Sequence, residues 1–286
     1  MPSVPIILVI LVNFFARIYK QFVNPDEVEP EEIYIASKEG NAKLIKEWLN
    51  KDPDLDLNRP VTNSGSTALM IACSFHNFEV VQLLLLEGNV DLELKDHQGR
   101  TAFFIACEKG NTKIVKEFLK YENVNINCIS KGGWTPLIIS SFHGYLDIVK
   151  LLLNKESLDI NAGNDYGETS FYFACMNGKV EVVKVLLNNH NLDINKTNNR
   201  GVTPLSKACY YGHLEIVEWI LVSQQQQQQQ QEVLINQKTL GATTKIEIIN
   251  LLESFIKNPK QVRIELREKL GYLGQKFLSF LIYLFI

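Results

Sequence analysis

Cysteine and histidine are the residues of this 286-residue chain best able to do chemistry, and there are five of each. A thiol beside an imidazole forms a nucleophile with its general base, and closely spaced Cys and His side chains bind zinc. The sequence contains no His-Glu-x-x-His and no Cys-x-x-Cys. An enzyme with a His-Cys pair would therefore need the fold to bring distant residues together, for example His143 and Cys175.

A phosphate-binding loop of the Gly-x-x-x-x-Gly-Lys type is also absent from the sequence. The two glycines after Lys131 belong instead to a turn that recurs along the chain. We therefore expect no catalytic residue, no metal site and no cofactor.

Four of the five cysteines mark a regular spacing, because each lies six residues after a threonine. These threonines belong to a series that recurs every 34 residues, at Thr67, Thr101, Thr135, Thr169 and Thr203. A glycine stands two residues before each of them. A fixed period of this size indicates a solenoid, in which each repeat buries its apolar face against its neighbours.

One repeat, residues 131–161, shows what each unit encodes. Thr135 is placed to cap a helix N-terminus, and Pro136 suits the first helical turn, where its missing N–H costs nothing. Gly144 suits the left-handed residue that ends this helix. In residues 146–153 apolar side chains recur at helical spacing. Each repeat is expected to form a helix, a turn, a second helix and an extended finger.

These repeats resemble ankyrin repeats. The resemblance rests on Gly-Trp-Thr-Pro-Leu at 133–137, Gly-Val-Thr-Pro-Leu at 201–205, Gly-His-Leu-Glu-Ile-Val-Glu at 212–218 and the recurring Ala-Cys pairs. It implies an all-α solenoid of helix-turn-helix repeats with β-turn fingers, whose concave face binds other proteins. The family's usual histidine after Thr-Pro-Leu is missing, so we expect apolar packing to replace its hydrogen bond. Its position holds Met70, Phe104, Ile138, Tyr172 and Ser206.

The repeats and the segments around them divide the chain into five parts. We expect an apolar N-terminal segment and linker (1–29), six repeats (30–221), a glutamine-rich insertion (222–232), a degenerate seventh repeat (233–256) and a basic, then apolar, tail (257–286). The first repeat lacks its finger and has a helix at 44–49, and the seventh has a helix at 247–252. The glutamine tract has no apolar face to bury and is expected to be a mobile insertion.

The cysteines and the charges limit the class of protein. Stacked helices lie about 8–10 Å apart, whereas a disulfide needs Cα atoms within about 7 Å, so the in-register cysteines cannot pair. We expect them to be small buried apolar residues, which favours a reducing compartment. The net charge is −3 and the basic residues are scattered, which argues against a nucleic-acid partner.

Aligning the repeats on their glycines predicts a partner-binding surface. It comprises the fingertips and the ninth and tenth residues after each glycine, which face the groove in ankyrin-like stacks. Several of these positions hold residue types enriched in interface hot spots. The predicted partner-binding residues are His97, Arg100, Lys109, Lys131, Trp134, Phe142, His143, Tyr166, Asn177, Arg200, Tyr210 and Tyr211. The alternative is that each aromatic residue only caps the apolar edge of its own repeat. On the binding hypothesis, Trp134→Ala with Tyr210→Ala abolishes partner capture and leaves the thermal melt almost unchanged.

The two ends of the chain are apolar at residues 4–16 and 277–286. As helices they would be about 20 Å and about 15 Å long, shorter than the roughly 30 Å core of a bilayer. Three alternatives remain: shallow anchoring in a membrane, caps over the ends of the solenoid, or a cleaved secretion signal. Residues 261–270 form an amphipathic pattern, with Val262, Leu266 and Leu270 on one face, suited to a membrane or a partner.

The sequence thus predicts a cytoplasmic, non-catalytic scaffold that binds another protein. The alternative is a membrane-associated adaptor on the cytosolic face, anchored by residues 4–16, residues 277–286 or both.

Overall fold

The computed structural model describes residues 28–87, 89–223 and 246–270. The chain divides into two compact units, unit 1 up to Val90 and unit 2 from Asp91 onward, and each is described by itself. Both apolar ends, the glutamine tract and the start of the predicted seventh repeat lie outside the described residues.

Unit 1 contains two pairs of antiparallel helices. The helices are α2 (Pro30–Glu39), α3 (Ala42–Lys51), α4 (Ala68–Ser74) and α5 (Phe78–Glu87). Helix α2 packs on α4 and α3 packs on α5, around the buried side chains of Ile33, Ile45 and Leu84. The Asn77 side chain donates to the carbonyl oxygens of Ser37 and Lys38 at 2.7 and 2.8 Å, which ties the two pairs together. The predicted helix at 44–49 lies within α3.

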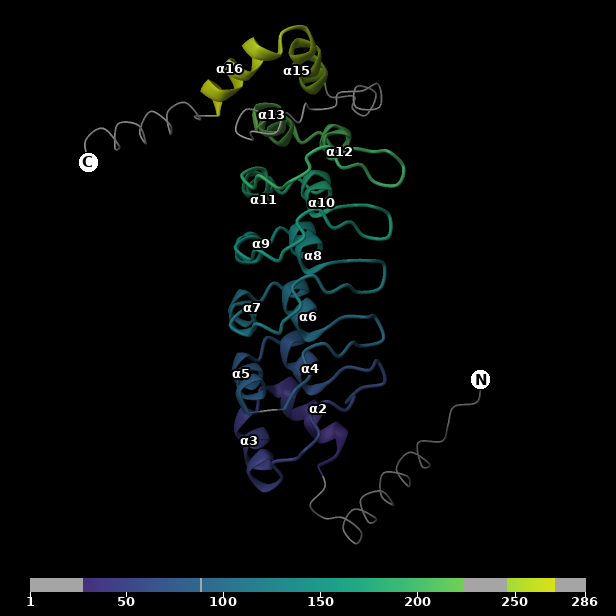
Figure 1. Cartoon of the computed structure of the whole chain (residues 1–286), viewed down its shortest axis with the longest axis vertical. Helices are drawn as coiled ribbons and strands as arrows, with labels where there is room; N and C mark the ends of the chain where they lie inside the picture. Colours follow the sequence, from purple (N-terminus) through teal and green to yellow (C-terminus); the bar gives the residue numbers. More distant parts are fainter. Residues whose placement is uncertain (1–27, 88, 224–245, 271–286) are drawn as a thin grey trace, which may run out of the picture. The chain divides into compact units, whose positions relative to one another are not determined.

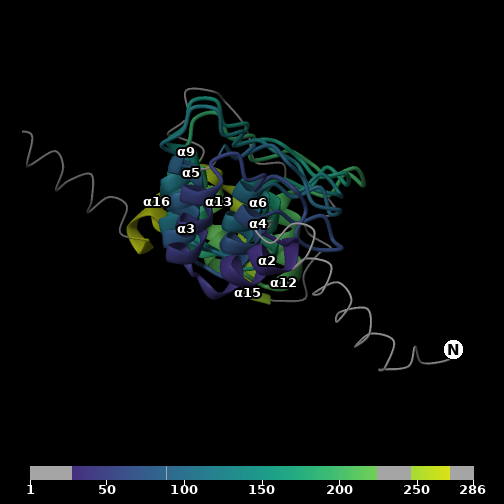
Figure 2. The same cartoon turned by 90° about the horizontal axis from the view of Figure 1, so that it is seen from below.

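Unit 2 repeats the same pairing four times. Its inner helices are α6 (Ala102–Glu108), α8 (Pro136–His143), α10 (Ser170–Met176) and α12 (Pro204–Tyr211). Its outer helices are α7 (Thr112–Phe118), α9 (Leu146–Leu153), α11 (Val180–Leu187) and α13 (Leu214–Ser223). Each helix packs on the next of its own column, and the fingers extend from the inner column (Figures 1 and 2).

Local sequence explains why the inner helices begin and end where they do. All five threonines of the 34-residue series are N-caps, and each hydroxyl accepts a hydrogen bond from the backbone N–H three residues later. Pro136 and Pro204 occupy the first turn of α8 and α12. Gly144 ends α8 in the left-handed conformation, with φ 86°. The predicted capping is confirmed.

Cys73, Cys107, Cys175 and Cys209, which share one repeat position, are buried as predicted. Cys128 is buried as well, and all five are free thiols. Burial raises the pKa of Cys209 to about 12. Burial also raises the pKa of Cys128 to about 11, although its hydrogen bond with Thr101 lowers it. These two thiols therefore remain protonated and act as small apolar residues in the core.

The position of the family's histidine requires a correction. Apolar packing does fill it at Met70, Phe104 and Ile138, which are buried. The expected loss of hydrogen bonding is wrong at the other two positions. The Asn198 side chain donates to the Tyr172 hydroxyl at 3.2 Å, from the following repeat. Ser206 shares a hydrogen bond of 2.8 Å with Thr203 in its own helix cap.

Two further helices, α15 (Ile246–Lys257) and α16 (Pro259–Lys269), follow in unit 2. Helix α16 packs on α13 and α15, where Val262 and Leu266 are buried. Lys269 pairs with the buried Glu218 of α13, and Arg263 donates to the Leu221 carbonyl at 3.3 Å. The expectation that this apolar face meets a membrane or another protein is therefore wrong, because the chain itself covers it. Among the described helices, none is long and apolar enough to cross a bilayer.

Candidate protein-binding surface

The fingers of unit 2 form a continuous edge because backbone hydrogen bonds join each finger to the next. The N–H groups of Lys131, Asp165 and Asn199 donate to the carbonyl oxygens of Gln98, Gly132 and Tyr166, at 2.8, 3.0 and 2.9 Å respectively. Within most of these fingers, the first side chain of the turn accepts hydrogen bonds from backbone N–H groups later in the same turn. In the last finger, for example, the Asn198 side chain accepts hydrogen bonds from the N–H groups of Arg200 and Val202, both at 3.0 Å. The ladder sets the fingertips in register.

All twelve predicted binding residues lie in unit 2, on this edge or at the C-terminal ends of the inner helices. They differ in exposure. The half-buried ones are Arg100, Trp134, Phe142 and Asn177. The exposed ones are His97, Lys109, Lys131, His143, Tyr166, Arg200, Tyr210 and Tyr211. The fingers and the inner helices together form what we call the inner face of unit 2.

Trp134 and Phe142 belong to the packing of the inner face. Trp134 stacks on Phe173 with ring centroids 4.7 Å apart, and Phe142 meets the edges of both rings at 5.7 and 5.6 Å. The three rings lie over the buried Ile138 and Tyr172. Removal of the Trp134 ring would therefore remove packing as well as contact surface. Substitution of Tyr210 and Tyr211 better separates the loss of contact surface from the loss of packing, because these side chains are 63% and 50% exposed.

An ion-pair network borders a cleft at the first finger of unit 2. Arg100 donates to Asp96 at 2.8 and 2.9 Å and to Glu108 at 2.9 Å. Burial lowers the pKa of Arg100, but its bonds to these two carboxylates outweigh burial and raise it. The cleft has a volume of about 220 Å³, and Phe104, Trp134 and Ile139 supply its apolar walls. Both carboxylates of this network thus share one cation within the chain.

A second network, around Tyr172, includes a residue that sequence reasoning missed. Lys207 lies over the rings of Tyr172, Tyr210 and Tyr211, with its ammonium 6.0, 5.6 and 5.9 Å from their centroids. The same repeat position holds Ile71, Ile105, Ile139 and Phe173. A lysine at an otherwise apolar position was the signal that could have identified it.

His143 and Cys175 do not form a catalytic pair. The His143 ring is exposed and stacks on Tyr145 at 5.2 Å. Cys175 is fully buried, and burial raises its pKa well above the usual value. A thiol in that state is a poor nucleophile. In the described part of the chain, no three His, Cys, Asp or Glu side chains come together as metal ligands would.

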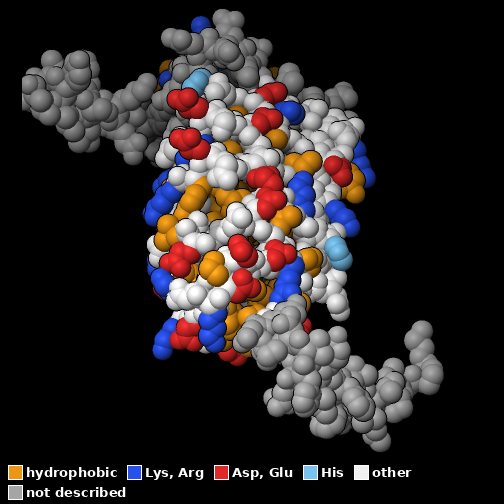
Figure 3. Space-filling model, turned by 60° about the horizontal axis from the view of Figure 1, so that its bottom comes forward, with side chains coloured by type: hydrophobic (Ala, Val, Ile, Leu, Met, Phe, Trp, Pro, Cys, Tyr) orange, Lys and Arg blue, Asp and Glu red, His pale blue; other side chains and the backbone are white. Residues whose placement is uncertain are grey.

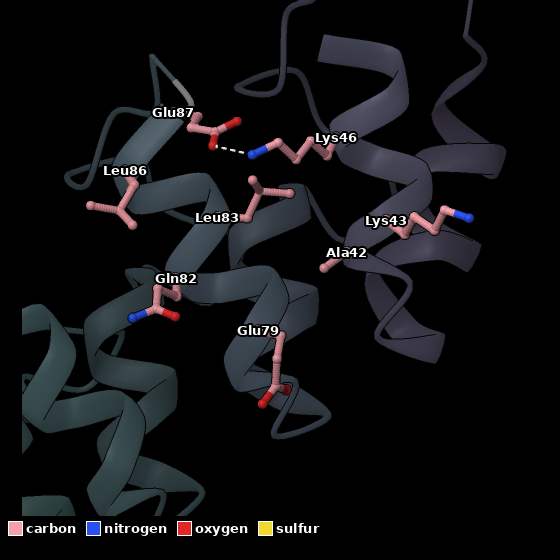
Figure 4. Close-up of a pocket in the computed structure, with 8 residues that line it drawn as sticks. All are labelled: Ala42, Lys43, Lys46, Glu79, Gln82, Leu83, Leu86 and Glu87. Atoms are coloured by element: carbon pink, nitrogen blue, oxygen red, sulfur yellow. Dashed lines mark hydrogen bonds and ion pairs between the residues drawn. The ribbon is translucent and has the colours of Figure 1, made fainter. Parts of the chain in front are cut away.

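Unit 1 has a groove of its own on the outer side, between α3 and α5 (Figure 4). Its volume is about 390 Å³, and a 2.8 Å ion pair between Lys46 and Glu87 crosses one end. Leu86 lines it and is 67% exposed. At the same repeat position the next three repeats hold Lys120, Asn154 and Asn188. The alignment of the repeats therefore showed a leucine at a position that is polar in these repeats, but we did not predict the groove from it.

Comparison with known proteins identifies the fold. A family model described as ankyrin repeats (3 copies) matches residues 33–91, 76–164 and 156–232. The crystal structure of EF0377, an ankyrin repeat protein, superposes with a TM-score of 0.63 at 27% sequence identity. The match covers 68% of this chain and 98% of that one. No match was found among curated proteins. The predicted all-α repeat solenoid is confirmed, and the chain belongs to the ankyrin-repeat family.

Proposed function

We propose that this protein is a non-catalytic scaffold that binds another protein through the inner face of unit 2. Ankyrin repeats are generally protein-interaction modules, and that class of function applies to this chain. The exposed pair Tyr210 and Tyr211 carries the finer proposal. The first of these two positions holds Ser74, Glu108 and Met176 in other repeats, so the helix itself needs no aromatic residue there.

The physical reason is the cost of leaving large rings in water. An aromatic side chain buries roughly 150–250 Å² when it is covered, and Tyr is among the residues enriched at binding hot spots. The two rings meet edge to face, with centroids 5.0 Å apart, and present one apolar patch. A partner that covers this patch gains the apolar contact and can also hydrogen-bond the two hydroxyls.

Affinity capture from cell extract followed by mass spectrometry tests the proposal. We expect the wild-type chain to enrich a defined set of proteins, and Tyr210→Ser with Tyr211→Ser to lose them while melting at the same temperature. The matched control is Ile256→Ser with Ile264→Ser, which removes two exposed apolar side chains from α15 and α16. If the tyrosine variant captures the same proteins as the wild type, the inner face is not the binding surface.

The membrane-associated adaptor is the second candidate, because residues 4–16 and 277–286 are apolar and have basic flanks toward the repeats. Flotation of the full-length protein with liposomes separates the two candidates. The scaffold alone stays with the soluble fraction, whereas the adaptor floats and loses this property when both segments are deleted. The scaffold proposal also places the protein in the cytoplasm. Five free thiols support this location, because thiols stay reduced in that compartment.

A further inference from the structure

We infer that the inner face of unit 2 binds an acidic, extended segment of the partner, with one carboxylate held by Lys207 beside Tyr210 and Tyr211. This inference rests on the proposed function and specifies the chemistry of the partner.

The acidic side chains of the inner face are partly engaged within the chain. Arg100 pairs with both Asp96 and Glu108, so its single positive charge offsets one of the two negative charges. The two oxygens of Glu168 accept hydrogen bonds from the side chains of Asn164 and Asn198, at 3.3 and 3.4 Å, and Glu168 keeps its charge. Asp165, at a fingertip, also remains anionic.

The lysines of the inner face are in the opposite situation. Lys109, Lys131, Lys179 and Lys207 form no ion pair with any carboxylate among the described residues. On the face shown in Figure 3, by contrast, Lys and Arg side chains are interspersed with Asp and Glu. These unpaired cations favour a partner that carries carboxylates.

Lys207 is the best placed of these cations. Cation–π attraction to three tyrosine rings holds its ammonium in place. This attraction involves no carboxylate of the chain, so the N–H groups of the ammonium can donate to a carboxylate of the partner. The rings also displace water from around the charge, which strengthens any ion pair formed there. A carboxylate arriving between them would receive charge-assisted hydrogen bonds.

His143 lies among charges of both signs at the other end of the surface. Its pKa is lowered chiefly by burial; Glu108 raises it, and Lys179 and Lys109 lower it. Glu108 belongs to α6, Lys109 follows that helix and Lys179 precedes α11. Two lysines and one carboxylate therefore act on the imidazole.

The cations are linked by a row of packed rings. Ring contacts run from Trp134, beside Lys131, through Phe173 to Tyr172, which lies under Lys207. Phe173 and Tyr172 are buried, so a partner can reach Trp134 at one end of the row and Tyr210 and Tyr211 at the other. Stacked helices are about 8–10 Å apart and an extended segment advances about 3.3 Å per residue, so successive repeats correspond to about three residues of the partner. The segment that fits has acidic residues at about this spacing with apolar residues between them.

Selection of random 12-residue peptides, displayed on phage, against the immobilised full-length protein tests this. We expect the recovered peptides to be rich in Asp and Glu, and their recovery to fall steeply as the salt concentration rises. One recovered peptide, made synthetically, is then measured by fluorescence anisotropy. We expect Lys207→Gln to weaken binding about tenfold, because it removes a charge-assisted hydrogen bond to the carboxylate of the peptide. Lys207→Arg should retain most of the affinity.

The outcomes separate the inference from the proposed function. Recovery that depends on Tyr210 and Tyr211 without enrichment of acidic residues overturns the inference and leaves the scaffold intact. Recovery that is unaffected by both tyrosines contradicts the proposed function. Tighter binding of a single-stranded DNA oligonucleotide than of any peptide overturns both. If Lys207→Gln lowers the melting temperature, its affinity is compared with that of Lys207→Arg at a temperature at which both variants are fully folded, and equal affinity of the two overturns the inference.

Discussion

At the scale of the residue, side-chain hydrogen bonds connect neighbouring repeats to one another. The Asn161 side chain uses both ends of its amide: it donates to the Asn191 carbonyl at 2.7 Å and accepts from the Asp193 N–H at 2.8 Å. Asn127 makes the same two contacts one repeat earlier, with Ser157 and Asp159. These amides join the loops that follow the outer helices.

Asn161→Asp is therefore expected to lower the free energy of unfolding by about 1–2 kcal/mol, because the variant keeps its shape but places a carboxylate against the Asn191 carbonyl. Urea denaturation followed by circular dichroism measures the change. The control is Asn154→Asp, at an exposed position after α9. Equal stability of the two variants would show that the amide bridge contributes nothing.

His143 gives a prediction about pH. Its pKa in the folded protein is lowered chiefly by burial, while Glu108 raises it and Lys179 and Lys109 lower it. As the pH falls through the usual range of histidine, the unfolded chain takes up this proton before the folded protein does, so stability decreases. We expect the urea midpoint to fall less between pH 7.5 and pH 5 in His143→Gln than in the wild type.

At the scale of the element, helix α16 completes the outer column of unit 2. It covers α13 at a position where the column has no further repeat among the described residues, so that Val222 is buried and Glu218 has a partner in Lys269. The amphipathic pattern of residues 261–270 is thus satisfied inside the molecule. Terminal repeats of a solenoid need such a cover, because one of their faces would otherwise meet water.

Leu266→Ala should destabilise unit 2 by about 2 kcal/mol, since Leu266 is buried against α13 and α15 at the edge of the core. Hydrogen exchange is expected to rise in α13 more than in α9. Ile264→Ala, on the exposed side of the same helix, is the matched control and should change neither. Faster exchange in both variants alike would mean that α16 frays without covering α13.

At the scale of the whole molecule, every cysteine is inaccessible in the folded chain. We expect a thiol reagent such as Ellman's reagent to label almost none of the five thiols in native buffer at pH 8, and all five in urea. Burial and the raised pKa values act in the same direction, because both remove the thiolate that reacts. Rapid labelling of one cysteine under native conditions would identify a repeat that opens locally.

The sequence predicted those features that depend on neighbours along the chain. Thr135 and Pro136 set the start of a helix and Gly144 sets its end, each through contacts within a few residues. The same signals recur with the 34-residue period. The sequence did not predict Lys207 over three rings or α16 on α13, because both depend on residues from other repeats. The loss of the family's histidine was misjudged for the same reason, since Asn198 reaches Tyr172 only in the folded stack.

The finger ladder has a consequence for how such a molecule can be altered. Backbone N–H and C=O groups join each finger to the next. The Asn199 side chain adds to this ladder, because it donates to the Asp165 carbonyl of the preceding finger at 3.0 Å. Exchange of the other fingertip side chains leaves the backbone bonds in place, so a new binding specificity can be introduced there while the scaffold is kept.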